Sequence, residues 1–198
     1  MKLINILLCL LISINTFCQE KELDGFWGIK FGTSKEKALE IMLENKNAKQ
    51  HPSPENPDLL IFLGCQFAGR PAKYITLAFI ENQLFDGRVY FEPELESQTI
   101  KLYKTIKSEL NEKYYKTKED YEIFQDPYEK GDGFETLAIQ AGKGQLASQW
   151  VFRREDNQGK NHIQLTITPK LLVILAYQDN LLASKAMNYN KKKNYQDY

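Results

Sequence analysis

The segment KYITLAFIENQLFDGRVYF, residues 73–91, decides the fold that we expect for this chain. Apolar side chains alternate with other residues on both sides of residues 81–83, which is the spacing of two strands joined by a hairpin. The side chains expected to point into the core are Ile75, Leu77, Phe79, Phe85, Val89 and Phe91. Those expected to point outward are Tyr74, Thr76, Ala78, Asp86, Arg88 and Tyr90. The segment therefore predicts an antiparallel pair with one buried face.

Similar patterns predict further strands at residues 59–67, 121–125, 134–140, 146–153, 162–168 and 171–177. Helical spacing instead marks residues 34–47, 96–115 and the shorter 180–188. The first helix follows a capping box formed by Thr33 and Glu36. Helices segregated from runs of strands favour the α+β class. We expect an antiparallel sheet with two main helices packed on one face and the other face open to solvent.

One short segment in each half of the chain is similar in sequence to the other. ITLAF at residues 75–79 is similar to IQLTI at residues 163–167, and each is followed by a short turn and another apolar strand. This similarity is consistent with a duplicated helix-plus-meander unit. Alternation alone also produces such matches, so the sequence leaves both explanations open.

The N-terminus has the order of a secretory signal peptide. Lys2 precedes an apolar run, Leu3 to Ile14, that is shorter than the roughly 20 residues needed to span a bilayer. We place cleavage after Cys18, which divides the chain into a signal peptide (1–18), one globular domain (19–184) and a basic flexible tail (185–198). The mature protein is expected to be periplasmic or secreted, without a stable membrane span.

Two alternatives remain for this end of the chain. Cys18 could carry a lipid that tethers a lipoprotein to a membrane, although the bulky Phe17 before it departs from the usual lipoprotein signal. The apolar run could also stay uncleaved as an anchor.

Charge and cysteine content exclude other classes. The whole chain has no net charge, and the tail carries four lysines against one aspartate, so the rest is mildly acidic. An acidic body is a poor phosphate-backbone binder, so we expect no nucleic-acid partner. Cys65 is the single cysteine after the proposed cleavage, which rules out a disulfide framework in the mature protein.

The signatures of common active sites are missing from the sequence. It has no Gly-x-Ser-x-Gly elbow, no phosphate-binding loop and no Gly-x-Gly-x-x-Gly motif. His51 and His162 have no second histidine or cysteine at metal-ligand spacing, and the acidic loop 126–133 has the wrong ligand spacing for calcium. We therefore predict no catalytic residue, no metal and no cofactor, and whether the chain is an enzyme is left open with binding favoured.

One constellation on the open face is a candidate binding site. The alternation places aromatic, guanidinium and amide side chains together there, namely Tyr74, Arg88, Tyr90, Gln149, Arg153 and Gln164. Tyrosine and arginine planes can stack on a ring or bind a carboxylate or a partner's backbone. The alternative is an ordinary solvated sheet face, because the same residue types are good strand formers.

The stretch WGIKFGTS, residues 27–34, and the helix with Ala38 that follows it carry a resemblance. This opening resembles that of many small exported proteins of Gram-negative bacteria whose function is unknown. More distantly, it is similar to the repeats of the beta-lactamase-inhibitor-protein-like fold and of small outer-membrane assembly lipoproteins. That resemblance implies helices packed on an antiparallel sheet in a binding module, and it transfers no functional residue.

The sequence thus favours a non-catalytic binding or interaction module of the cell envelope, with a protein, a small molecule or a glycan as its ligand. One alternative is an envelope hydrolase whose acid/base pair converges only in the folded chain. Another is a structural accessory of an envelope assembly. Only the three-dimensional structure shows which of these side chains come together.

Overall fold

The computed structural model describes residues 22–196, apart from residues 47, 53–55, 155 and 157. The predicted signal peptide, with Cys18, lies outside the described residues. Among the helices of the described part, none combines the length and the apolar character that crossing a membrane requires.

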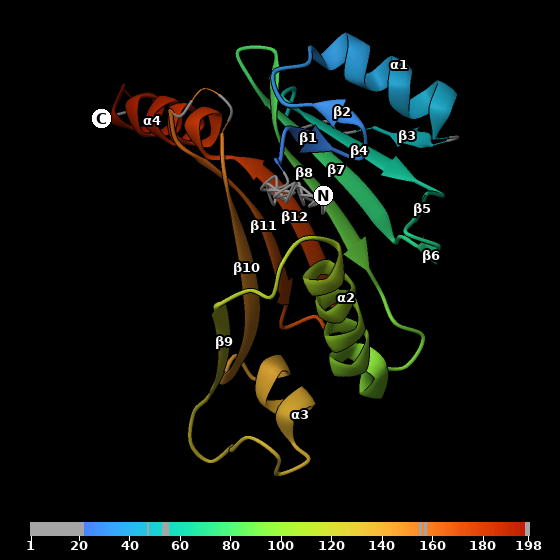
Figure 1. Cartoon of the computed structure of the whole chain (residues 1–198), viewed down its shortest axis with the longest axis vertical. Helices are drawn as coiled ribbons and strands as arrows, with labels where there is room; N and C mark the ends of the chain where they lie inside the picture. Colours follow the sequence, from blue (N-terminus) through green and yellow to red (C-terminus); the bar gives the residue numbers. More distant parts are fainter. Residues whose placement is uncertain (1–21, 47, 53–55, 155, 157, 197–198) are drawn as a thin grey trace, which may run out of the picture.

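In the described part of the chain, an eight-stranded antiparallel sheet forms the body, with four α-helices around it (Figure 1). In spatial order its strands are β3 (Lys49–His51), β4 (Leu59–Leu63), β7 (Tyr74–Ile80), β8 (Gln83–Phe91), β12 (Val173–Asp179), β11 (Lys160–Ile167), β10 (Gly144–Arg153) and β9 (Glu119–Phe124). The small hairpins are β1 (Gly25–Phe26) with β2 (Ile29–Lys30), and β5 (Gln66–Phe67) with β6 (Arg70–Pro71). The predicted α+β class with an antiparallel sheet is confirmed.

The helices are α1 (Lys35–Asn45), α2 (Thr99–Lys113) after a 3-10 turn (Glu96–Gln98), α3 (Glu135–Gln140) and α4 (Asn180–Gln196). One face of the sheet, here called the inner face, holds the main core. Buried side chains of α1 and α2 belong to that core, and Tyr103 of α2 hydrogen bonds to Ser148 of the sheet at 2.6 Å. Helix α4 packs against β7, β8, β11 and β12, and its Asn180 meets His162 on the opposite, open face.

The sheet register follows the predicted alternation except at Phe85, which was expected in the core but is left unpaired by a register shift, so that Leu84 takes the buried position. Ile75, opposite Val89, is fully buried, and Val89 lies opposite Leu175 in the neighbouring strand β12. Trp150 fills the same layer further along the sheet and has no exposed surface. Because side chains alternate along each strand, the residues between these positions point to the open face.

The strand pairing repeats along the chain. In the first half Leu60 lies opposite Leu77, and 88 residues further along Ser148 lies opposite Leu165. In the same way, the pairing of β7 with β8 recurs with the same spacing in that of β11 with β12. At the centre of the sheet Arg88 lies opposite Ala176, which is also 88 residues away. Three strands of each half therefore share one register.

Local structure differs from the expectation in four places. Residues 134–140 were expected to form a strand, but residues 135–140 form α3 instead. The segment contains Leu, Ala and Gln, which are good helix formers. Just before the helix, Asp132 accepts a hydrogen bond from the Phe134 N–H at 2.7 Å. Helix α1 is capped by Ser34 instead of Thr33. Strand β3 begins just before the proline-rich loop and was not predicted. The predicted boundary between residues 184 and 185 falls inside α4, which continues through residue 196.

Candidate binding surface on the open sheet face

Five of the six predicted site residues lie in two adjacent rows across the open face. Arg88, Gln164 and Gln149 share one row with Thr76 and Ala176, since each lies opposite the next in the strand pairing. The next row holds Tyr74, Tyr90, Ile174, Thr166, Ala147 and Tyr121. The two rows are adjacent in the sheet and are here called the open-face patch, within which Thr76, Ala147 and Ala176 are themselves buried. It crosses the centre of the sheet from β7 to β9.

Tyr74 and Tyr90 form the aromatic end of the open-face patch. Their rings stack with centroids 4.2 Å apart and planes 27° from parallel, as expected for residues directly opposite each other in neighbouring strands. Both residues are half-buried, and burial raises the pKa of the Tyr74 phenol. The pair is therefore a neutral, ordered apolar platform with its remaining surface open to a partner.

Arg88 is held in place by Asp86, two residues earlier in the same strand. Its Nε and Nη2 donate to the two carboxylate oxygens at 2.7 and 3.0 Å, and Gln178 Nε2 donates to the same carboxylate at 2.9 Å. The bonds to Asp86 raise the pKa of the Arg88 guanidinium. The Asp86 side chain is only 3% exposed, whereas that of Arg88 is 42% exposed. The positive charge of Arg88 is therefore neutralised by a carboxylate buried beneath it. Arg88 thus offers a stacking plane more than a free cation.

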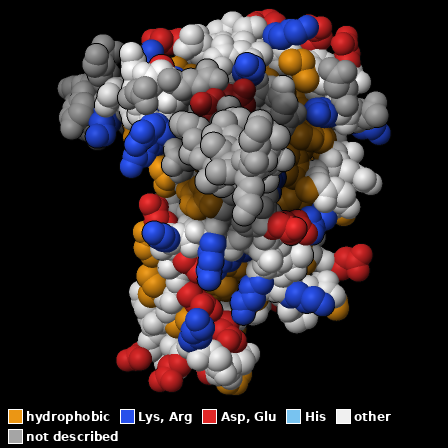
Figure 2. All heavy atoms as spheres, in the orientation of Figure 1, with side chains coloured by type: hydrophobic (Ala, Val, Ile, Leu, Met, Phe, Trp, Pro, Cys, Tyr) orange, Lys and Arg blue, Asp and Glu red, His pale blue; other side chains and the backbone are white. Residues whose placement is uncertain are grey.

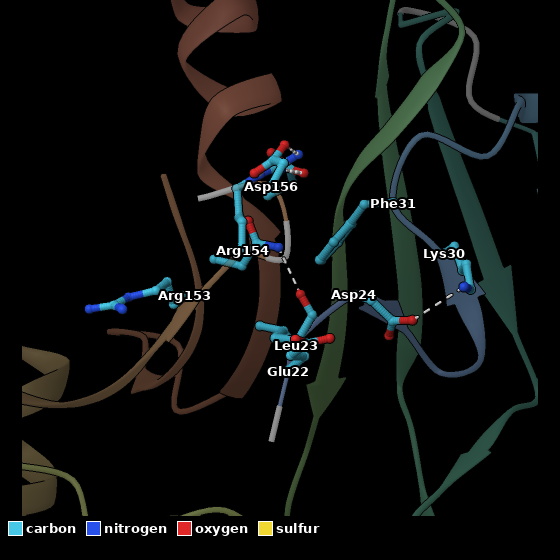
Figure 3. Close-up of a pocket in the computed structure, with 10 residues that line it drawn as sticks. Glu22, Leu23, Asp24, Lys30, Phe31, Arg153, Arg154 and Asp156 are labelled. Carbon is cyan, nitrogen blue, oxygen red and sulfur yellow. Dashed lines mark hydrogen bonds and ion pairs between the residues drawn. The ribbon is translucent and has the colours of Figure 1, made fainter. Parts of the chain in front are cut away.

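Arg153 does not join the other five residues. It lies opposite Lys160 at the far end of the β10–β11 hairpin, four residues beyond Gln149, which is about 13 Å along a strand. Arg153 instead contributes to the lining of the pocket drawn in Figure 3, where its guanidinium extends away from Arg154. Neither Arg153 nor Lys160 has a carboxylate partner among the described residues. Two like charges directly opposite each other form a separate basic spot at the end of the sheet.

The sequence predicted a short helix at residues 180–188, but not that this helix, α4, packs on the open face and narrows it. Leu182 and Ala183 of α4 are buried, and His162 Nδ1 lies 2.5 Å from Asn180 Oδ1 at the start of that helix. Burial lowers the pKa of His162, so the neutral imidazole is favoured there. His162 therefore links α4 to the sheet. The apolar pair at 182–183 was the available signal, but a short helix after the last strand does not reveal which face it covers.

A charged pocket of about 230 Å³ lies at one end of strands β10, β11 and β12, beside the N-terminal segment (Figure 3). Arg154 binds Asp156 and the buried Asp179, while Asp24 pairs with Lys30. The hydrogen bond from Arg154 lowers the pKa of Asp156. The ionised form of Asp156 is thereby favoured, whereas a general acid needs its pKa raised. Among the described residues no cluster of His, Cys, Asp and Glu could hold a metal ion.

These features define a class of protein: a mixed α+β chain with an eight-stranded antiparallel sheet and a tyrosine- and glutamine-bearing face. Comparisons with protein families, with curated proteins and with solved structures returned no match for the chain.

Proposed function

We propose that this chain is an exported, non-catalytic binding module of the cell envelope that recognises a protein partner through the open-face patch. The observation that carries the proposal is the adjacent pair of rows in which five of the six predicted residues meet. An irregular scatter of the same residues would have offered no common surface. Export is supported by the sequence pattern of residues 1–18.

A protein partner suits the chemistry of the open-face patch. Interface cores are rich in aromatic side chains and poor in unpaired charges. The patch combines the stacked Tyr74–Tyr90 pair with Ile174, Thr166 and two glutamines, and Asp86 neutralises its central arginine. Side chains already ordered by the sheet lose little conformational freedom when they bind.

The proposal includes two finer features of the fold. One is that α1 and α2 cover the same face of the sheet, which agrees with their shared hydrophobic core. The other is that the chain contains a duplicated helix-plus-meander unit, one copy running from α1 to β8 and the other from α2 to β12. The common register of three strands in each half supports it. A homologue with a different register in one half only would count against duplication.

Export is expected to leave a mature protein that begins at Gln19. Cleavage after Cys18 follows from the short apolar run and the small residues near the cut. Intact-mass spectrometry of the protein recovered from a periplasmic fraction or from culture medium measures this directly. A product that retains Met1, or recovery only from cytosol, contradicts export. An added lipid mass on Cys18 supports the lipoprotein alternative instead.

Replacing both stacked tyrosines, Tyr74→Ala with Tyr90→Ala, is expected to reduce partner capture about 30-fold. Buried tyrosines at interface centres commonly cost about 2 kcal/mol each when truncated, which makes 30-fold a conservative value for two. The measurement is quantitative capture from an envelope extract on immobilised protein, followed by titration of the recovered partner.

The matched control for that experiment is Tyr189→Ala, because Tyr189 is a 57% exposed tyrosine on α4 away from the two rows. Its capture is expected to equal that of the wild type. Unfolding curves of all variants separate loss of binding from loss of folding. Equal capture by the folded double variant and the wild type removes the open-face patch as the binding surface.

A further inference from the structure

The second half of helix α4 is exposed and carries only basic charge. Near the start of the helix Leu182 and Ala183 are buried, whereas Met187 and Tyr189 are 59% and 57% exposed. The whole helix contains four lysines and no acidic residue. Among the described residues, neither Lys185 nor Lys191 has an ion-pair partner. We refer to residues 185–196 as the basic helix end.

The basic helix end has little to stabilise it in the free protein. Positions 187, 188, 189 and 191 are exposed and span more than one turn, so exposed side chains are spread around the helix axis. Short helical segments without packed side chains are only marginally stable in water. Met187 and Tyr189 also expose apolar surface beside the lysines. This segment therefore has the character of a surface that another molecule covers.

Apolar side chains are exposed at the opposite end of the molecule as well. Leu95 and Phe134 are each 59% exposed, and Leu137 is 49% exposed. A hydrogen bond of 3.2 Å from Gln140 Nε2 to Glu96 Oε2 holds α3 beside the 3-10 turn that follows Leu95. The three apolar side chains therefore belong to the same end of the fold.

Carboxylates accompany these apolar side chains. Glu94 directly precedes Leu95, and Asp126 and Glu129 belong to the loop that leads into α3. All three are exposed, and none forms an ion pair with another residue that the structure describes. Figure 2 shows acidic side chains at the lower end of the molecule, where Figure 1 places α3, and basic side chains at the upper left beside α4. We refer to the three carboxylates with Leu95, Phe134 and Leu137 as the acidic end.

The basic helix end and the acidic end complement each other in charge, and both expose apolar surface. They lie toward opposite ends of the long axis of the molecule, so one chain does not join its own two ends (Figure 1). Two basic helix ends repel each other, and so do two acidic ends, which disfavours a two-fold symmetric dimer through either surface. Contact between unlike ends of two copies covers both surfaces with matched charge.

We propose that the protein associates with itself head to tail, with the basic helix end of one copy on the acidic end of the next. Such a contact leaves one free end of each kind, so assembly continues beyond a dimer as the concentration rises. Because the contact uses short segments and exposed charges, it is expected to be weak, with a Kd of about 100 µM. Neither surface belongs to the open-face patch, so the inference does not depend on the protein partner proposed for that patch.

The test is sedimentation equilibrium of the purified protein and of two variants that each alter one end. Lys185→Glu with Lys191→Glu changes the basic helix end, and Glu94→Lys with Glu129→Lys changes the acidic end. The average mass of the wild type is expected to rise with concentration up to about 300 µM, and each variant is expected to associate at least tenfold more weakly. An equal mixture of the two variants restores one intact contact, so it is expected to form a dimer that does not grow.

Lys116→Glu with Lys118→Glu is the matched control, because these exposed lysines lie between α2 and β9, outside both surfaces, and it is expected to associate like the wild type. Unfolding curves confirm that each variant is folded. The proposal is overturned by a wild type that stays monomeric at about 300 µM, by a folded variant that associates as strongly as the wild type, or by a mixture that stays monomeric or grows beyond a dimer. If the monomeric wild type binds vesicles of anionic phospholipid and the lysine variant does not, the basic helix end contacts a membrane instead of a second copy.

Discussion

Replacing Trp150 by alanine is expected to lower the free energy of unfolding by about 4 kcal/mol, the range measured for large aromatic residues in cores. Trp150 is fully buried on β10. Its indole N–H also donates to Asn111 Oδ1 at 3.1 Å and to the Tyr115 carbonyl at 3.0 Å, which joins the sheet to the end of α2. Alanine leaves a cavity and two acceptors without their donor. Urea denaturation followed by far-ultraviolet circular dichroism measures the loss.

Trp150→Phe separates the two contributions. It keeps most of the apolar volume and removes the indole donor, so it is expected to cost about half as much as alanine. A loss below about 1.5 kcal/mol for Trp150→Ala, less than an ordinary core truncation, would show that the neighbouring side chains collapse into the space.

Gly87→Ala is expected to destabilise the protein by about 3 kcal/mol through overpacking. A methyl group on Gly87 would lie 2.3 Å from Cγ of Phe26, well inside van der Waals contact. Phe26 is fully buried against Tyr177, with ring centroids 5.5 Å apart, so it has little room to move. The position is also in a central strand, between β7 and β12.

A double-mutant cycle with Phe26→Ala checks the cause. In that background the Gly87→Ala change is expected to cost less, because the contacts with Cγ and Cδ1 of the ring are gone and only the contact with Cβ of residue 26, at 2.7 Å, remains. A cost that is equal in both backgrounds would mean that alanine disturbs the strand itself, with no contribution from the Phe26 ring. The unfolding free energies of the four proteins give the answer.

Strands with strict alternation were the most predictable part of the fold. Residues 73–91 form β7 and β8 with the expected faces except at Phe85, where a register shift puts Leu84 in the core instead, since one-sided burial in a sheet imposes a period of two. The segment that becomes α3 is too short for its period to distinguish a strand from a helix. Its helical state depends on tertiary packing: Gly144 at the start of β10 lies so close that a methyl group there would be 2.9 Å from the Ile139 nitrogen.

The candidate surface was predictable for a related reason. Alternation places Arg88, Gln149 and Gln164 on the same face, but it does not say which strands are neighbours or how far along each strand a residue lies. For that reason Arg153 lies on the predicted face of the sheet but too far along its strand to join the other five residues. The pocket lined by Phe67, Phe91 and Tyr177 could not be foreseen, because these residues come from segments far apart in the sequence and meet only through the sheet order.

Joining β8 to β12 in the middle of the sheet has a consequence for solubility. The last strand of each half is hydrogen-bonded to the other half at this junction. Among the described residues the sheet therefore has two edge strands, β3 and β9. The first is only three residues long, and the second carries Glu119, Asp120 and Glu122. Short or charged borders discourage a sheet from recruiting further chains. The edge strands thus disfavour strand pairing between molecules, which would extend the sheet into fibres, although one face of the sheet stays accessible to a partner.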